Sequence, residues 1–219
     1  MKKLVSIVVF LAMVLSIQAQ NLGLFAGVNM MDNYPFQESN DHYYTHFSPK
    51  VGYSFGLELD DIRIVKIPIK FTGKIVKYNG GISHESSGLG GSYNFDVNQE
   101  NYYLSMGLHL LKNKSSSPLQ LSLGVEYSIL LSEKFTGSTK TWSTSTAVEN
   151  KTIDENSFDL NMKNKFAIIG TIGYKKEIMT GWFIEPQFSV LAGFTKELQL
   201  FDPVYALKYL LEFGISKKL

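Results

Sequence analysis

The 219-residue sequence contains no cysteine, which excludes a disulfide framework, a thiolate metal site and a lipid-modified N-terminal cysteine. Proline is scarce, with 6 residues, so few positions are barred from the interior of a β-sheet. Behind the first 20 residues, no apolar run approaches the roughly 18 residues that a membrane-spanning helix needs. The 21 basic and 20 acidic residues nearly cancel, which argues against a nucleic-acid-binding domain.

Residues 1–19 have the organisation of a secretory signal peptide. Lys2 and Lys3 form a basic start, residues 4–17 form an apolar stretch, and Ala19 is a plausible cleavage position before Gln20. The remaining residues, 20–219, are enough for one domain. A secreted chain without a spanning helix can still be integral to a membrane if its strands close into a barrel.

Residues 205–215 alternate between large apolar side chains and side chains that are mostly small or charged. Because successive side chains of a β-strand point to opposite faces, this segment predicts a strand with one apolar face and one largely polar face. The apolar set is Tyr205, Leu207, Tyr209, Leu211, Phe213 and Ile215.

Seven further segments share this alternation, so eight strands are predicted. The eight span residues 22–30, 51–59, 66–78, 102–110, 119–131, 166–174, 182–194 and 205–215. Pro68 and Pro186 fall inside two of them and lack the N–H that a β-ladder uses. Each proline therefore predicts a bulge or a strand end.

The connections between these strands alternate in length. Residues 60–65, 112–118 and 175–181 read as short turns, whereas residues 32–50, 79–99 and 132–161 read as long polar loops, and residues 196–203 as a shorter one. The Ser/Thr-rich stretch 136–146 has the composition of a mobile loop tip. Short turns at one end and longer loops at the other predict an all-β fold, an eight-stranded antiparallel up-and-down transmembrane β-barrel of the bacterial outer membrane.

Alternation alone leaves open whether the apolar face points to lipid or into a soluble, lipocalin-like barrel. The polar face consists mainly of Gly, Ser, Ala and Thr, with one or two charges per strand, which suits a narrow interior. Aromatic residues also gather near the ends of the apolar faces, as in the interfacial girdles of membrane barrels. These residues are Tyr53, Tyr102, Tyr174, Trp182, Phe194, Tyr205 and Phe213. We therefore expect the apolar face to contact outer-membrane lipid.

Four short segments resemble strands of the small outer-membrane β-barrel domain common in Bacteroidetes, the PorT-like group. They are residues 52–59 (GYSFGLEL), 102–106 (YYLSM), 124–127 (GVEY) and 211–215 (LEFGI). The resemblance covers essentially the whole mature chain, but it consists of the spacing of the strands and of short strand motifs. It implies an eight-stranded barrel in the outer membrane. The named member of the PorT-like group serves a protein secretion system. No motif in this sequence indicates that role.

Two loop motifs contain residue types used in catalysis or metal binding. His42 and His46 beside Asp41 would lie on one face only in a helix, so a solvated loop is the simpler interpretation. Residues 84–87 (HESS) contain the residue types of a Ser-His-acid set, but triad members converge from separate elements. No catalytic, cofactor-binding or metal-ligating residue is therefore assigned, and no cofactor is expected.

Other polar residues have simpler interpretations. His109 falls on the polar face of its strand, where a hydrogen bond to a neighbouring side chain is expected. The acidic pairs at residues 60–61 and 154–155 lie in predicted connections, where solvated charge is expected.

Four acidic and four basic residues fall on the polar faces of the predicted strands. An eight-stranded barrel is just wide enough for side chains to fill it, so charges in its lumen should pair across the axis. The candidates for lumen ion pairs are Glu58, Lys70, Lys74, Glu126, Lys165, Glu185, Lys208 and Glu212. Such pairing predicts a plugged barrel, whereas a gated polar path for a small solute is the functional alternative.

Three functions from different classes remain open. The first is a non-enzymatic anchor whose long loops bind an envelope or extracellular protein partner. The second is a narrow, porin-like solute channel, which needs a continuous wet lumen. The third is a lipid-modifying enzyme or protease, which needs a nucleophile and a base at the outer rim. We expect the first of these.

Overall fold

The computed structural model describes residues 21–34, 43–64, 67–88, 90–111, 118–143, 146–155, 165–194 and 205–219. The predicted signal peptide, residues 1–19, lies outside these ranges and stays a prediction. The described residues hold no helix long and apolar enough to cross a membrane. Their strands are β1 (Asn21–Tyr34), β2 (Tyr43–Ile64), β3 (Ile67–Gly88), β4 (Gly91–Leu111), β5 (Leu119–Ser143), β6 (Thr146–Glu155), β7 (Lys165–Tyr174), β8 (Lys176–Met179), β9 (Trp182–Gly193) and β10 (Tyr205–Lys218).

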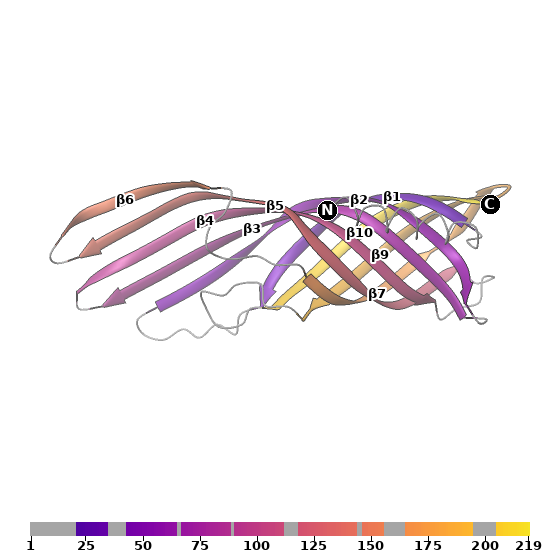
Figure 1. Ribbon diagram of the computed structural model, residues 1–219, viewed down its shortest axis with the longest axis horizontal. Helices are drawn as coiled ribbons and strands as arrows, with labels where there is room; N and C mark the ends of the chain where they lie inside the picture. Colours follow the sequence, from indigo (N-terminus) through magenta and orange to yellow (C-terminus); the bar gives the residue numbers. More distant parts are fainter. Residues whose placement is uncertain are drawn as a thin grey trace, which may run out of the picture.

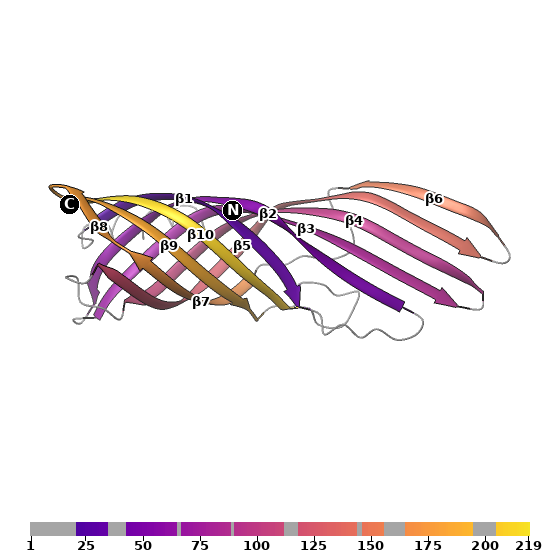
Figure 2. The ribbon, with the colours of Figure 1, turned by 180° about the vertical axis from the view of Figure 1, so that it is seen from behind.

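Eight of these strands close into an antiparallel ring. The hydrogen-bonded order runs β1, β2, β3, β4, β5, β7, β9 and β10, and β10 pairs again with β1. Figures 1 and 2 show this barrel from opposite sides. Ring neighbours follow one another along the chain, so the predicted up-and-down, eight-stranded architecture is confirmed. Each predicted segment coincides with one ring strand to within a residue or lies inside it.

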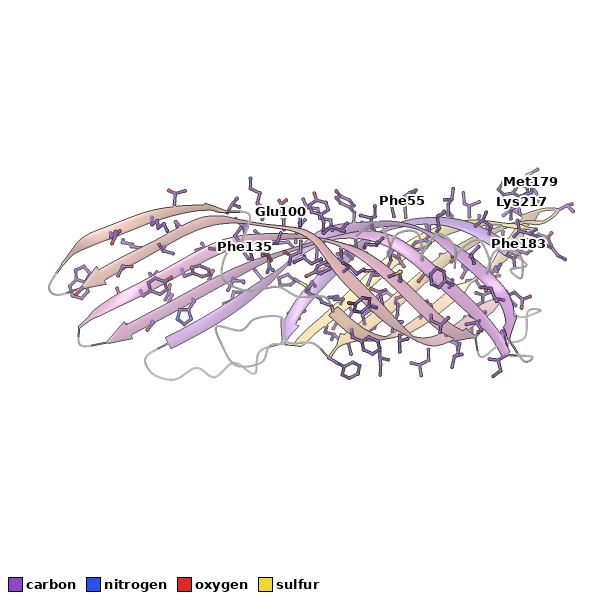
Figure 3. All side chains as sticks on the ribbon, in the orientation of Figure 1. Phe55, Glu100, Phe135, Met179, Phe183 and Lys217 are labelled. Carbon is purple, nitrogen blue, oxygen red and sulfur yellow. The ribbon has the colours of Figure 1, made fainter. Side chains whose placement is uncertain are left out.

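The two faces of the ring strands are chemically distinct. On β5, Leu123 is 62% exposed on the outer face, whereas Glu126 on the inner face is 1% exposed. The same holds on β10, where Leu211 is exposed and Glu212 is buried. In Figure 3 the side chain of Phe55 projects outward from the ring. The predicted apolar-out register is therefore confirmed.

Aromatic side chains stand at both ends of the apolar outer face. Tyr174 and Trp182 are exposed at the end that carries the short turns, and Tyr53 and Phe194 are exposed at the opposite end. This distribution is typical of the two interfacial girdles of a membrane barrel. We call the first end the short-turn end, and the second, where the sheet continues beyond the ring, the extension end.

The predicted long loops are largely β-sheet, which corrects the sequence interpretation. Strands β3 and β4 stay paired out to Gly88 and Gly91, and β5 stays paired with β4 out to Ser143. Strand β6 pairs with the outer part of β5. The sheet thus continues beyond the ring as an open extension built from β2 to β6, on the left of Figure 1.

Composition misled the loop assignment because an open, water-exposed sheet is polar on most of its surface. The stretch 136–146, interpreted as a loop tip, contributes residues 136–143 to β5. Its threonines are β-branched and favour strands, and its cross-strand hydrogen bonds do not depend on apolar side chains.

The two prolines mark different irregularities. Pro68 lies one residue inside the start of β3, which confirms the predicted strand end. Pro186 lies within β9, whose pairing with β10 is continuous. The predicted bulge or strand end at Pro186 is therefore wrong. The interruption lies instead in the chain that pairs with β9. Strands β7 and β8 pair with β9 in the same register, and Lys175, which belongs to neither strand, separates them. The predicted short turn 175–181 therefore contains strand β8.

The outer face contacts the apolar band of the membrane. A charge added to this face should therefore cost more in the middle of the band than at its edge. Leu123→Arg places a cation near the middle of the apolar band and should lower the free energy of unfolding by about 2–4 kcal/mol. Leu119→Arg, at the short-turn end of the same strand, should cost only about 0–1 kcal/mol. Urea titration of the refolded barrel in lipid vesicles measures both. Equal losses for the two variants would contradict the register.

Candidate functional site

The eight predicted lumen residues are all buried on the inner face of the ring. Their exposed fractions lie between 1% and 4%. They come from six strands: Glu58 from β2, Lys70 and Lys74 from β3, Glu126 from β5, Lys165 from β7, Glu185 from β9, and Lys208 and Glu212 from β10. The structure brings six of them into two separate groups of direct ion pairs and places the other two elsewhere.

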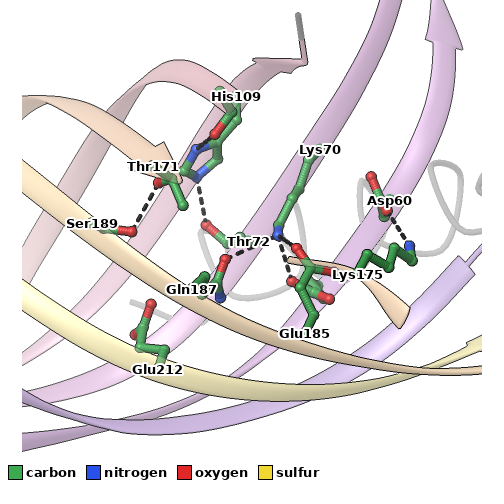
Figure 4. Close-up of polar contacts among 12 residues, drawn as sticks. Asp60, Lys70, Thr72, His109, Thr171, Lys175, Glu185, Gln187, Ser189 and Glu212 are labelled. Carbon is green, nitrogen blue, oxygen red and sulfur yellow. Dashed lines mark hydrogen bonds and ion pairs between the residues drawn. The ribbon is translucent and has the colours of Figure 1, made fainter. Parts of the chain in front are cut away.

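Lys70 is the centre of the first group, nearer the short-turn end. Its Nζ lies 2.9 Å from Glu58 Oε2 and 2.8 Å from Glu185 Oε1. It also donates to Gln187 Oε1 at 3.1 Å. Figure 4 shows Glu185 and Gln187 reaching Lys70 across the lumen from β9. One ammonium with three donor hydrogens thus holds side chains from both sides of the ring.

Lys74 is the centre of the second group, four residues further along β3. Its Nζ lies 2.9 Å from Glu126 Oε2 and 3.9 Å from Glu212 Oε1. The Ser54 hydroxyl donates to that same Glu212 oxygen at 2.7 Å. Glu212 is thus held by Lys74 from β3 and by Ser54 from β2.

Lys165 and Lys208 lie against aromatic rings rather than in either group. Lys208 Nζ lies 4.6 Å from the centroid of the Tyr78 ring, and Lys165 Nζ lies 4.7 Å from that of Tyr103. The two rings pack edge to face, with centroids 5.9 Å apart. Met31 and Val76 complete this buried cluster. Cation–π contact of this kind stabilises a buried ammonium.

Asp60 and Asp61 are buried, which corrects their interpretation as solvated charge. Asp60 Oδ2 lies 2.5 Å from Lys175 Nζ, and the Asp61 backbone N–H donates to Asp60 Oδ1 at 2.8 Å. Asp61 has a φ of 57°, at a register shift between β2 and β3. Asp60 follows Glu58 by two residues and continues the inner-face alternation, whereas the bulge at Asp61 interrupts that alternation.

His109 lies on the inner face of β4 with both ring nitrogens near hydroxyls. Thr72 Oγ1 is 3.4 Å from Nε2, and Ser122 Oγ is 3.4 Å from Nδ1. The predicted hydrogen bonding to neighbouring side chains is therefore confirmed, as Figure 4 shows for Thr72.

The residues of the loop motifs that the structure describes do not assemble a reactive site. His84 lies on β3 in the extension, where successive side chains point to opposite faces and cannot converge, and burial lowers its pKa. His46 is an exposed residue of β2, whereas His42 and Asp41 lie outside the described residues. The pair at residues 154–155 belongs to β6 rather than to a connection. No group of three His, Asp or Glu in the described ranges could hold a metal ion.

The site is thus the interior of a closed ring with an apolar outer surface. The protein is a small membrane-spanning β-barrel. No protein-family model matches the chain, and no curated protein matches it in sequence.

Among the solved structures that are similar to the chain are those of three bacterial proteins. Neisserial surface protein A matches with a TM-score of 0.46 and 10% identity, over 91% of this chain and 96% of that one. OprG, an outer membrane protein from Pseudomonas aeruginosa, matches with a TM-score of 0.46 and 9% identity, over 92% and 98%. Ail, the attachment invasion locus protein of Yersinia pestis, matches with a TM-score of 0.43 and 10% identity, over 90% and 99%.

Sequence reasoning missed two sets of lumen residues. Asp60 and Lys175 belong to predicted turns, although each continues the inner-face alternation, two residues after Glu58 and Gly173. The amides of Asn29, Gln99 and Asn101 are buried on the inner face. Continuing the alternation of residues 102–110 backwards along the chain would have placed Gln99 and Asn101 there.

Breaking the Lys70 group should be costly, because two carboxylates would lose their cation in a buried site. Lys70→Met should lower the free energy of unfolding by about 3–5 kcal/mol. Adding Glu185→Gln should recover part of that loss. Lys77→Met is the matched control, because its pair with Glu100 is partly exposed and should contribute about 0–1 kcal/mol. Equal losses for Lys70→Met and Lys77→Met in urea titrations would contradict the network.

Proposed function

We propose that the protein is a non-enzymatic, integral β-barrel of the bacterial outer membrane that presents its sheet extension to an extracellular or envelope protein partner. The observation that carries this proposal is the length of β3, β4 and β5, which stay paired well beyond the ring. A barrel that only anchors needs strands that cross the apolar band, about 9–11 residues each. The extension adds a paired surface that anchoring does not require.

The surface of the extension supports a role in recognition. Its outer part is rich in Ser, Thr, Asn and charged side chains, among them Lys140, Asp96 and Glu149, all of which are exposed. A hydrogen-bonded sheet holds such groups in fixed positions more firmly than a loop does, which lowers the entropy cost of binding.

Orientation and family enter as parts of the same proposal. Short turns face the periplasm in outer-membrane barrels, so the extension faces outward. The strand motifs at residues 52–59 and 211–215 support membership of the PorT-like group, and they form the adjoining ring strands β2 and β10 on either side of β1. Lipid is the partner of the apolar outer face.

The ion-paired lumen favours an anchor over a channel. Lys70 and Lys74 each bind carboxylates from opposite sides of the ring, so their side chains cross the path that a solute would take. In planar bilayers the wild-type barrel should therefore show little steady conductance. A stable ohmic pore that changes with Lys74→Met would overturn this part of the proposal in favour of the channel.

Trimming the extension tests the main proposal. Replacing residues 81–98 by Asn-Gly joins Gly80 to Gln99, which already face each other across β3 and β4, through a two-residue hairpin turn. The trimmed protein should still fractionate with the outer membrane and show heat-modifiable gel mobility, because the ring is unchanged. Proteins that co-purify with wild type from detergent-solubilised membrane should be lost.

Lys176→Ala, an exposed change at the short-turn end, is the control and should retain those partners. Recovery of the same partners with the trimmed variant would contradict the role of the extension. Recovery of the trimmed or wild-type protein in the soluble periplasm would contradict the membrane assignment itself.

A further inference from the structure

The apolar outer face of the ring has a gap where β7 carries a glycine instead of a large side chain. Gly170 pairs with Leu123 of β5 on one side and with Val190 of β9 on the other, all on the outer face. A Cβ built on Gly170 would meet no atom within 4 Å, so the space above it is open. An apolar groove of about 580 Å³ results, lined among others by Leu121, Leu123, Ile172, Phe188 and Val190.

The groove lies near the middle of the apolar band, and β7 leads from it to the short-turn end. Because β7 and β8 pair with β9 in the same register, Gly170 and Lys176 lie on the same face of the sheet. The step from residue 170 to residue 176 spans about 20 Å along the strands, or about 15 Å of height at a tilt of about 40°. That height is about half of a hydrocarbon core of about 30 Å. A lipid with its headgroup at Lys176 would therefore end its acyl chain near the groove.

Two lysines and a tryptophan stand on the outer face at the short-turn end of this path. Lys176 of β8 pairs with Ile184 of β9, and Lys217 of β10 pairs with Trp182 of β9. Both lysines are exposed, and Lys217 Nζ lies 5.5 Å from the centroid of the Trp182 ring. Figure 3 shows Lys217 at this end of the barrel. Since β8 and β10 flank β9, with about 4.8 Å between neighbouring strands, the two long side chains can reach a phosphate between them.

The acidic side chains of the same three strands do not face this site. Glu177 pairs with Phe183 on the opposite face of β8, and its Oε1 accepts the Gly181 backbone N–H at 2.7 Å. Glu185 of β9 and Glu212 of β10 are buried in the lumen. The two exposed ammonium groups therefore attract an anion at the level where lipid headgroups lie.

We propose that this path on the outer face binds a single phospholipid with an anionic headgroup, from the leaflet at the short-turn end. Lys176 and Lys217 bind its phosphate, and Trp182 packs at the headgroup level, where indole rings gather in membrane proteins. One acyl chain follows β7 and β9 to the groove at Gly170. The lysines favour this lipid over a second copy of the apolar outer face, which offers no anion. The site requires the membrane-spanning ring and is independent of the partner-binding role proposed for the extension.

Native mass spectrometry of the refolded barrel, residues 20–219, tests the site. The detergent micelles contain equal amounts of a phosphatidylglycerol and a phosphatidylcholine with the same acyl chains, so that only the headgroup differs. Wild type should retain a single lipid and prefer phosphatidylglycerol by about 5–30-fold, the effect of one to two lysines near an anionic headgroup. Equal occupancy by the two lipids, or no retained lipid, would overturn the proposal.

The headgroup end is tested by removing both cations. The double variant Lys176→Gln/Lys217→Gln should lose the preference for phosphatidylglycerol. Lys218→Gln is the matched control, because Lys218 is exposed at the same end but pairs with Asn21 on the inner-face side of β10. It should keep the wild-type preference.

The acyl-chain end is tested by filling the groove. Gly170→Phe should lower the amount of retained lipid by about tenfold, because the acyl chain loses apolar contact area. Gly73→Phe is the matched control. Gly73 lies on the outer face of β3, opposite Leu57, and a Cβ there would also meet no atom within 4 Å. This control should retain lipid as wild type does.

Heat-modifiable gel mobility shows which variants are folded. Unchanged lipid preference in the folded lysine double variant would overturn the proposal, and that result does not depend on whether Gly170→Phe refolds. Equal lipid retention by folded Gly170→Phe and Gly73→Phe would also overturn it. A wild-type dimer that Gly170→Phe abolishes would do the same, because it would assign the groove to a second copy of the chain.

Discussion

The structure depends on one constraint: closing eight strands into a ring leaves a lumen that side chains fill. A charge in that space has little access to water and must find its counter-charge among residues facing it across the axis. Lys70 and Lys74 meet this condition by each contacting two carboxylates from other strands. The ion pairs therefore link opposite sides of the ring, in addition to the hydrogen bonds that link its neighbours.

The same strands pass through two environments and change their chemistry accordingly. In the ring, the outer face of β5 is apolar from Leu119 to Tyr127, because lipid surrounds it. Beyond the ring, the outer part of β5 is mostly polar and partly exposed, and it is flanked by β4 and β6. A single long strand can thus cross the apolar band and support a water-exposed sheet without a joint between them.

The rim is where the two environments meet, and it is where polar groups remain unmatched. Beneath it, carboxylates and lysines satisfy one another. Beyond the rim, the sheet of β2 to β6 does not close into a ring. The amides of Gln99 and Asn101 lie at this transition, with the aromatic rings that hold Lys165 and Lys208 beside them.

Alternation of side chains along the sequence was sufficient to predict the eight ring strands, their order and the face that each presents to lipid, because a period of two is a local property of a strand. It also placed Glu58, Lys70 and the other lumen charges on the inner face. Only the tertiary structure decided which charges meet, since a pair such as Lys70 and Glu185 is set by ring closure and strand stagger. The same closure brought Asp60 to Lys175, and cross-strand pairing turned the predicted polar loops into sheet. These features depend on contacts between residues far apart in the chain, so no local sequence pattern predicts them.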